Sequence, residues 1–337
     1  MLFKNAELFN IGGLIPAEGG GYHMIRMPAD VRAAMPEGNS QSVSLCPAGA
    51  EIRFVINRGT AKITIRSNDT RKMVVCYGAI HRGADPTKDF YGTENTVIEV
   101  APSSEPEKLA KLHELCGYKY SPRLIRLLPE GFGHDIIVDI EGDIRPPLPE
   151  EVPEKRFIMY GSSITHGCFS MTQNNTYVYQ LARKLGYDGY NFGFGGACLL
   201  EKEVCDYLAE QGTERNDRTW DFAILEPCIN TVYGMDEEEY TRRATHLFDV
   251  LAEKNPDKLL FVTDCYPHYG ELTDDGKTEA RRKALHRIIE GRRNIVFTPG
   301  DQLLTSFSGL SADGIHPNVD GVTEIAENWY KVIKKYV

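Results

Sequence analysis

A proline-rich segment divides this sequence into two halves whose hydrophobic patterns differ. Residues 145–155 contain four prolines in eleven positions, which neither a helix interior nor a central strand tolerates. Apolar residues before it recur with a period of two, whereas short apolar runs after it alternate with helical patterns. We therefore expect a domain over 1–144, a linker over 145–155 and a second domain over 156–337. A length of 337 residues also suits about two domains.

The first half is typical of an all-β domain. Apolar residues alternate at positions 52, 54 and 56 and at 61, 63 and 65, as on strands with one buried face. Further short runs lie at 42–46, 73–80, 96–101, 124–128 and 135–144, separated by Gly, Asn, Asp and Pro. This spacing predicts a β-sandwich of the jelly-roll kind, with one short helix at 105–116. The first 40 residues are too weakly patterned to assign.

The second half predicts an α/β domain. Apolar runs at 156–160, 189–194, 221–226, 258–263 and 294–298 alternate with helical periods. Helices are expected near 178–185, where a residue of 174–176 can cap the first turn, near 240–251, and over about 319–335. Alternating strands and helices favour a parallel sheet with helices on both faces. We therefore expect a flavodoxin-like three-layer fold.

Composition excludes several classes of protein. The net charge is −10, whereas nucleic-acid binding needs a basic face. No apolar run reaches the roughly 18 residues of a membrane span, and the N-terminus lacks the pattern of a signal peptide. The eight cysteines form no Cys-x-x-Cys pair, so zinc spacing is absent and free thiols are expected. We expect a cytoplasmic protein without metal, cofactor, nucleic-acid or membrane partner, and leave open whether it is a homo-oligomer.

The residues that follow the predicted strands carry the chemistry. In an open parallel sheet, ligands bind beyond the carboxyl ends of the strands. Four segments reach that edge: Gly-Ser-Ser-Ile-Thr-His-Gly at 161–167, Gly-Phe-Gly-Gly-Ala at 193–197, Glu-Pro-Cys-Ile-Asn at 226–230 and Asp-Gly-Ile-His-Pro at 313–317. They supply a hydroxyl, free backbone N–H groups, a side-chain amide, and an acid with an imidazole. Those are the parts of serine acyl transfer.

Each part has a chemical reason. A serine hydroxyl such as that of Ser163 becomes a good nucleophile only when a base takes its proton, and His316 can be that base because an imidazole titrates near neutrality. Asp313, three residues before His316, can hold the ring in one tautomer. The tetrahedral intermediate carries an oxyanion that needs fixed donors. The candidates are the N–H groups of Ser163 and Gly196 and the side-chain amide of Asn230.

Other interpretations of these residues are weaker. A serine after a strand is often only a helix cap, but three further segments accompany this one. A dinucleotide loop at 193–196 would need a third glycine where Cys198 stands. His166 and His268 are expected to line the pocket or lie at the surface rather than bind metal, since no cluster has ligand spacing. Glu226 ends a strand and receives no role.

These four segments resemble the conserved blocks of the SGNH (GDSL-type) hydrolase superfamily. The run at 161–165 is similar to its first block, Gly196 to the glycine of the second, Asn230 to the asparagine of the third, and Asp-x-x-His at 313–316 to the last. The resemblance covers about 155–337 and implies catalytic Ser163, Asp313 and His316, with Ser163, Gly196 and Asn230 forming the oxyanion hole. Ser162 stands where the family usually has aspartate, and Cys228 and Thr231 replace the glycine and aspartate around the asparagine.

A β-rich domain before an SGNH domain resembles two-domain carbohydrate esterases and some acyltransferases. The resemblance therefore implies a serine ester hydrolase that removes an acyl group, expected to be acetyl, from a carbohydrate or another small ester. An acyltransferase and a lipase or lysophospholipase remain alternatives, although an acidic domain repels anionic phospholipids at long range. A sugar-binding protein without catalysis is the non-enzymatic alternative.

Overall fold

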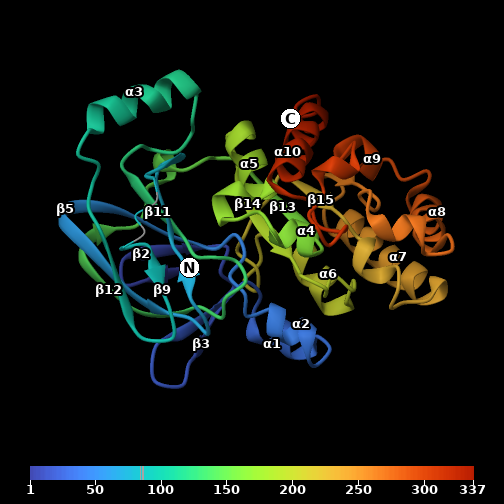
Figure 1. The fold of residues 1–337 in the computed structure, drawn as a ribbon, viewed down its shortest axis with the longest axis horizontal. Helices are drawn as coiled ribbons and strands as arrows, with labels where there is room; N and C mark the ends of the chain where they lie inside the picture. The colour runs from blue at the N-terminus through green and yellow to red at the C-terminus, as the bar shows by residue number, and fades with distance from the viewer. Residues whose placement is uncertain (84, 86) are drawn as a thin grey trace.

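The computed structural model describes residues 1–83, 85 and 87–337. Figure 1 shows two parts side by side: an N-terminal part of mainly strands, blue to green, and a C-terminal part of strands and helices, yellow-green to red. Among the described residues, no helix has both the length and the apolar character needed to cross a membrane. All eight cysteines are free thiols, as predicted.

The N-terminal part is built on a ten-stranded sheet. Its strands are β1 (Leu2–Phe3), β2 (Ala6–Phe9), β3 (Gly13–Pro16), β4 (Tyr22–Ile25), β5 (Glu51–Arg66), β7 (Val74–Tyr77), β8 (Ile80–His81), β10 (Thr96–Val100), β11 (Leu124–Leu128) and β12 (Ile136–Arg145). A separate pair joins β6 (Arg71–Lys72) to β9 (Phe90–Tyr91). Every pairing in this part is antiparallel, which confirms the antiparallel β character; the two-layer jelly-roll arrangement stays a prediction.

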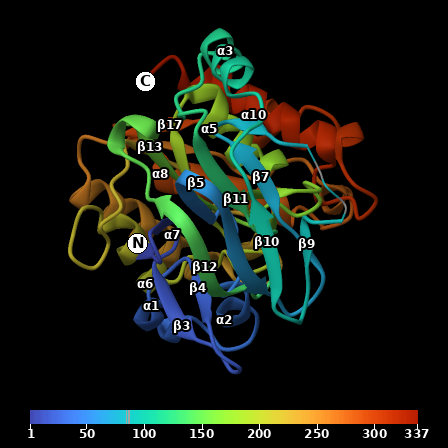
Figure 2. The ribbon, with the colours of Figure 1, turned by 90° about the vertical axis from the view of Figure 1, so that its left-hand side faces the viewer.

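The long strand β5 organises this sheet, as Figure 2 shows. β11 pairs with its first half, β10 with its second half, and β12 with both. Buried aliphatic residues from these strands form one core. Three helices accompany the strands: α1 (Ala29–Ala34), α2 (Asn39–Val43) and α3 (Pro106–Cys116), of which α3 matches the predicted short helix.

The prediction of a strand at 42–46 is wrong. Its first residues end helix α2, and the chain then turns. The carbonyl oxygens of Val43 and Cys46 accept hydrogen bonds from the buried guanidinium of Arg26, at 3.5 and 2.9 Å, and Pro47 has no N–H for a strand ladder. Contacts with a distant part of the chain therefore override the local β propensity.

The C-terminal part contains a parallel five-stranded sheet in the order β14-β13-β15-β16-β17. The strands are β13 (Arg156–Gly161), β14 (Asp188–Gly193), β15 (Phe222–Leu225), β16 (Leu259–Val262) and β17 (Ile295–Phe297). Numbered within this part, the order is 2-1-3-4-5, which is the flavodoxin-like order. The predicted parallel sheet is confirmed. The order in which strands are added reverses between β13 and β15, and such folds bind ligands at this point.

Helices cover both faces of this sheet. Alternate residues of the strands pack on α6 (Lys202–Ala209), α7 (Glu237–Lys254) and α8 (Lys277–Ile289) on one face. The other residues pack on α5 (Tyr177–Leu185), α9 (Gly300–Leu303) and α10 (Val319–Ile333) on the opposite face. Thr176 caps α5, accepting from the N–H of Tyr179. The short elements are helix α4 (Ser163–His166) and the 3-10 turns η1 (Pro149–Glu151), η2 (Gln173–Asn175), η3 (Ile229–Thr231), η4 (Tyr269–Leu272) and η5 (Phe307–Gly309).

The two parts are tightly joined. Phe9, Met27 and Val31 of the N-terminal part belong to the core that covers one face of the parallel sheet. Arg26 is fully buried and donates to the carbonyl oxygens of Asn191 and Gly193 at 3.1 and 2.8 Å. These contacts fix the end of β14 against the N-terminal part. The predicted linker contains the end of β12 and turn η1, and the division into domains stays a prediction.

Candidate active site

The first strand of the parallel sheet ends directly in the turn that carries Ser163. The chain leaves β13 at Gly161, and Ser162 caps α4 by accepting from the N–H of Ile164 at 3.2 Å. Ser163 is therefore the first helical residue. Gly161 is required here, because a Cβ at this position would lie 2.2 Å from Oγ1 of Thr165.

Ser163, His316 and Asp313 form a continuous hydrogen-bonded chain. Oγ of Ser163 lies 2.7 Å from Nε2 of His316, and Nδ1 of His316 lies 2.5 Å from Oδ2 of Asp313. The carboxylate can only accept, so the ring donates through Nδ1–H and leaves Nε2 to accept from the serine hydroxyl. The structure thus brings Ser163 together with His316, 153 positions away in the sequence, and with Asp313.

Backbone N–H groups hold the carboxylate of Asp313 in position beside His316. Oδ1 of Asp313 accepts from the N–H groups of Ile315 and His316, both at 3.0 Å. Partial burial acts to raise the pKa of Asp313, but the hydrogen bonds from the His316 ring and from these two N–H groups outweigh it and lower the pKa. The carboxylate therefore stays ionised at neutral pH and can stabilise a protonated imidazole.

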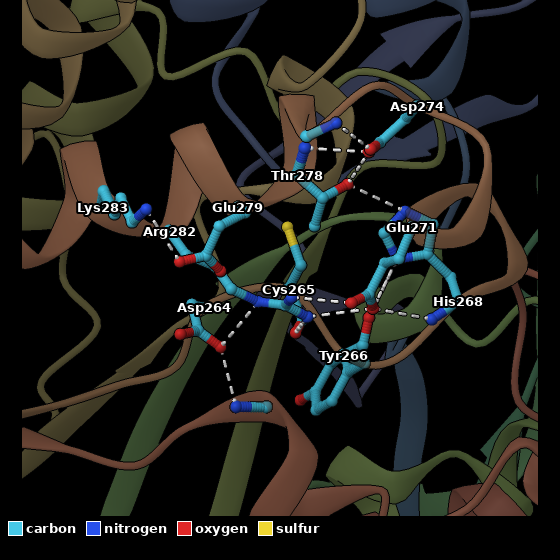
Figure 3. Close-up of polar contacts among 12 residues, drawn as sticks. Asp264, Cys265, Tyr266, His268, Glu271, Asp274, Thr278, Glu279, Arg282 and Lys283 are labelled. Atoms are coloured by element: carbon cyan, nitrogen blue, oxygen red, sulfur yellow. Dashed lines mark hydrogen bonds and ion pairs between the residues drawn. The ribbon is translucent and has the colours of Figure 1, made fainter.

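The segment after β16 supports this loop from the other side. The N–H of Tyr269 donates to the carbonyl oxygen of Gly314 at 2.6 Å. Turn η4, which carries Tyr269, is fixed by Glu271: its carboxylate accepts from the N–H of His268 at 3.0 Å and from Arg282 at 2.7 and 3.0 Å. Figure 3 shows the contacts of Glu271 with His268 and Arg282, together with the neighbouring bonds of Thr278 and Asp274. The network anchors the loop between Asp313 and His316 to helix α8.

Three hydrogen-bond donors are available for an oxyanion. Within the part of the chain that the structure describes, no protein group accepts from the backbone N–H of Ser163 or of Gly196. The side chain of Asn230 uses its oxygen to accept from the N–H of Cys198 at 3.1 Å, so its NH₂ group remains free to donate. That bond also joins the loop after β14 to the turn after β15. The three predicted donors are therefore not consumed by the fold.

Glu226, to which the sequence analysis assigned no role, holds the turn that carries Ser163. Its side chain is fully buried at the end of β15, and Oε2 accepts from the N–H of Ser162 at 2.8 Å. Burial raises the pKa of Glu226 to about 7, and the hydrogen bonds from Ser162 only partly oppose this. The only signal in the sequence was an acid at the end of an apolar strand.

His166 and His268 were expected either to line the pocket or to lie at the surface, and the structure excludes the surface. His166 is fully buried and His268 is 2% exposed. His268 lies 3.1 Å from the carbonyl oxygen of Tyr266 through Nδ1 and 3.3 Å from Oγ1 of Thr278 through Nε2. Both rings have their nitrogens engaged with protein groups because the surrounding loops pack over them.

An aromatic side chain stands beside the imidazole. The ring centroid of Phe169 lies 5.4 Å from that of His316, and Phe169 is 53% exposed. Phe169 and Met171 both have positive φ angles, 59° and 68°, which is unusual for bulky residues. Such strained backbone persists only where the surrounding structure holds it. The segment therefore offers an apolar surface next to the reactive groups.

Comparison with known proteins identifies the family of the C-terminal part. Residues 154–334 match the model of the GDSL-like lipase/acylhydrolase family. No curated protein sequence matches the chain. Among solved structures, the chain is similar to a salicylyl-acyltransferase from a tetracycline biosynthetic pathway, with a TM-score of 0.76 and 12% identity over 98% of this chain and 95% of the other.

Two esterases have the same fold. An acetyl xylan esterase from the rumen bacterium Butyrivibrio proteoclasticus has a TM-score of 0.59 and 12% identity over 99% of this chain and 96% of the other. A family two carbohydrate esterase from Clostridium thermocellum has a TM-score of 0.60 and 12% identity over 85% and 91%. At such identities the likeness shows the fold of both parts, and the reaction has to be argued from the site.

Proposed function

Since the chain belongs to the GDSL-like lipase/acylhydrolase family, we propose that it is a serine ester hydrolase that removes acetyl groups from a carbohydrate. The observation that carries the chemistry is the hydrogen-bonded chain from Ser163 through His316 to Asp313, with distances of 2.7 and 2.5 Å. The substrate class is supported by the two esterases of the same fold and by the apolar surface at Phe169, because aromatic rings can pack on the C–H face of a sugar.

The mechanism proceeds in two halves. Oγ of Ser163 attacks the acyl carbon as its proton moves to Nε2 of His316, and the resulting oxyanion accepts from the N–H groups of Ser163 and Gly196 and from the amide of Asn230. The intermediate collapses when the alcohol leaves with the proton from His316, and an acyl-enzyme remains. Water then attacks the acyl-enzyme while its proton moves to His316. The second intermediate collapses as His316 returns that proton to Oγ of Ser163, which releases the carboxylic acid and regenerates the serine.

The acyltransferase alternative differs only in the second half. An acceptor hydroxyl or amine would replace water, with the same residues in the same roles. One observation favours this alternative: the TM-score of the acyltransferase, 0.76, is higher than those of the two esterases, 0.59 and 0.60. The choice between water and another acceptor is made by what occupies the space above Ser163 after the alcohol leaves.

The test compares acyl release and acyl transfer with the purified chain. We expect hydrolysis of p-nitrophenyl acetate, faster release of acetate from acetylated xylo-oligosaccharides, and loss of both with Ser163→Ala. Accumulation of a new ester when glycerol or a sugar is supplied, at the expense of acetate, would favour the transferase. Absence of turnover with any of these esters, or turnover that survives Ser163→Ala, would overturn the proposal.

A further inference from the structure

His166 connects the N-terminal part to the loop that carries an oxyanion donor. It is fully buried and lies three residues after Ser163 in helix α4. Its Nε2 lies 2.6 Å from the carbonyl oxygen of Gly131, and its ring stacks on Phe132 with centroids 3.9 Å apart and planes at 12°. Its Nδ1 lies 3.2 Å from the backbone nitrogen of Gly195. The ring thus spans the space between the two parts.

The partners fix the state of this ring. A backbone N–H can only donate, so Nδ1 accepts from Gly195 and Nε2–H donates to the carbonyl of Gly131. Burial and the charge of Arg26 lower the pKa of His166 to about 3, against the opposing effect of the Gly131 carbonyl. The ring is therefore neutral at the pH of any ordinary assay. Its contribution is a fixed acceptor rather than a proton.

Gly195 is held at its other end as well. Its carbonyl oxygen accepts from the side-chain amide of Asn39, the first residue of α2 in the N-terminal part, at 3.1 Å. The atoms of that carbonyl and of the Gly196 N–H share one planar trans peptide, in which the two groups point in opposite directions. Holding the oxygen therefore also aims the N–H of Gly196.

The Cα of Gly195 has neighbours from both parts. A Cβ at Gly195 would lie 3.4 Å from the ring of Phe132, 3.6 Å from Nδ1 of His166 and 3.8 Å from Cβ of Ser163. Gly195 is half-buried, and it lies within contact distance of both the nucleophile and the N-terminal part. A small rotation of the peptide would move the Gly196 N–H away from the reacting carbonyl.

We infer that His166 and Asn39 are positioning residues that aim the backbone N–H of Gly196 at the oxyanion, so that the N-terminal part takes part in catalysis. This inference rests on the proposed function, because it presumes that Gly196 serves an acyl-transfer reaction. Neither residue touches the reacting atoms: His166 acts through Gly195, and Asn39 acts through the Gly195 carbonyl. Removal of one oxyanion donor costs about 10²–10³ in kcat, which sets the largest loss that mispositioning can cause.

A pair of amide substitutions separates the two contacts of His166. In His166→Asn the amide oxygen can replace Nδ1 as acceptor for the Gly195 N–H, whereas in His166→Gln the longer side chain can replace Nε2 and donate to Gly131. We expect His166→Asn to keep kcat within about tenfold of the wild type and His166→Gln to lose about 10²-fold, both with KM little changed. Thermal unfolding of both variants identifies any loss that comes from misfolding.

Substitution of Asn39 provides a second test of the inference, because this side chain is exposed and its removal leaves the core intact. Asn39→Ala should lower kcat several-fold at unchanged KM, while Ser42→Ala, an exposed residue on the same helix, should match the wild type. Equal losses in His166→Asn and His166→Gln together with a neutral Asn39→Ala would overturn the inference. A raised KM with normal kcat in Asn39→Ala would instead make Asn39 a substrate contact and would also overturn its positioning role.

A readout that needs no turnover keeps this test separate from the proposed function. With ¹⁵N-glycine labelling, the amide signals of Gly195 and Gly196 should shift in His166→Gln and Asn39→Ala but not in Ser42→Ala. Unchanged glycine signals in both variants contradict the positioning role whatever the activity. Lack of wild-type turnover contradicts the proposed function alone, since the glycine signals still report on the peptide.

Discussion

The guanidinium of Arg53 in strand β5 forms a two-pronged ion pair with the carboxylate of Asp188 at the start of β14, at 3.0 and 2.7 Å. Both side chains are 1% exposed. Arg53 also donates to Glu51 at 2.7 Å and lies over the ring of Phe9 at 3.6 Å. This buried ion pair joins strand β5 of the N-terminal sheet to strand β14 of the parallel sheet.

Arg53→Ala is expected to destabilise the whole chain, because it leaves the buried carboxylate of Asp188 without its cation, whereas Glu51 keeps its ion pair with Arg126. The free energy of unfolding should fall by about 3–5 kcal/mol, measured by urea denaturation. Lys111→Ala, which breaks an exposed pair with Glu114, should cost about 0–1 kcal/mol. An Arg53→Ala loss as small as that of Lys111→Ala would show that the pair does not hold the two parts together.

Substitutions of the adjacent residues Ser162 and Ser163 should have different effects on activity. Ser163→Ala removes the hydroxyl bonded to His316 and should abolish esterase turnover without loss of stability. Ser162→Ala removes the cap on Ile164 and should cost about 1 kcal/mol of stability while most activity remains. Initial rates and thermal unfolding of both variants give the comparison, and the opposite order of activities would assign the nucleophile to Ser162.

Asn230→Ala is expected to lower kcat by about 10²–10³ with a much smaller change in KM. The reason is that its NH₂ group acts on charge that develops only in the transition state. Steady-state kinetics on p-nitrophenyl acetate give both constants. Asn57→Ala, at an exposed asparagine in the N-terminal part, serves as the control. A wild-type kcat with a raised KM would make Asn230 a substrate-binding residue.

Activity should rise with pH through one ionisation, that of the base. The lowered pKa of Asp313 keeps its carboxylate ionised across pH 5–8, so it contributes no step of its own there. Asp313→Asn places an amide donor opposite Nδ1 and favours the unproductive tautomer, a change that costs about 10⁴ in a protease triad. We expect a smaller loss than for His316→Ala, because the backbone of the short turn still holds the ring.

The pH profiles of kcat/KM for the wild type and both variants test this mechanism, together with a chelator control. A flat wild-type profile from pH 5 to 8 would contradict an imidazole base. Loss of wild-type activity in the chelator would show that the reaction needs a metal, which the serine mechanism does not use.

Glu226 should make the protein less stable as pH rises towards neutrality. Burial raises its pKa from 4.5 to about 7, so the folded chain keeps a proton that the unfolded chain releases. The stabilisation is complete below pH 4.5 and is lost as pH rises to about 7, with a change on the order of 3 kcal/mol. Asp135, whose pKa burial also raises to about 7, adds to the same trend.

Glu226→Gln should reduce this dependence and leave the part that Asp135 contributes, because an amide can still accept from Ser162 but does not titrate. Urea unfolding at pH 5 and pH 7 measures the difference between the two slopes. Glu253→Gln, at an exposed position on helix α7, should retain the wild-type slope. A Glu226→Gln variant that also retains it would mean that the buried carboxyl is not protonated in the folded chain.

The sequence by itself predicted most of the local elements and the residues that meet at the candidate site. The periods of its apolar residues predicted the parallel sheet and its helices, because each strand or helix must bury one face. The four segments at 161–167, 193–197, 226–230 and 313–317 could be assigned to one edge, since all strands of a parallel sheet end on the same side. Ser163, His316 and Asp313 followed from that placement.

Only the tertiary structure decided which distant groups meet. Cys46 lies in a run with strand-like alternation but gives its carbonyl to Arg26 instead of to a ladder. His166 became buried because Phe132 packs on it, and Asn39 reached Gly195 across 156 positions. Such contacts leave no periodic signal, because a single hydrogen bond or ring contact between separate elements requires no pattern along either one. The sequence therefore determines the chemistry of the site, and the packing of the N-terminal part against it decides how that site is held.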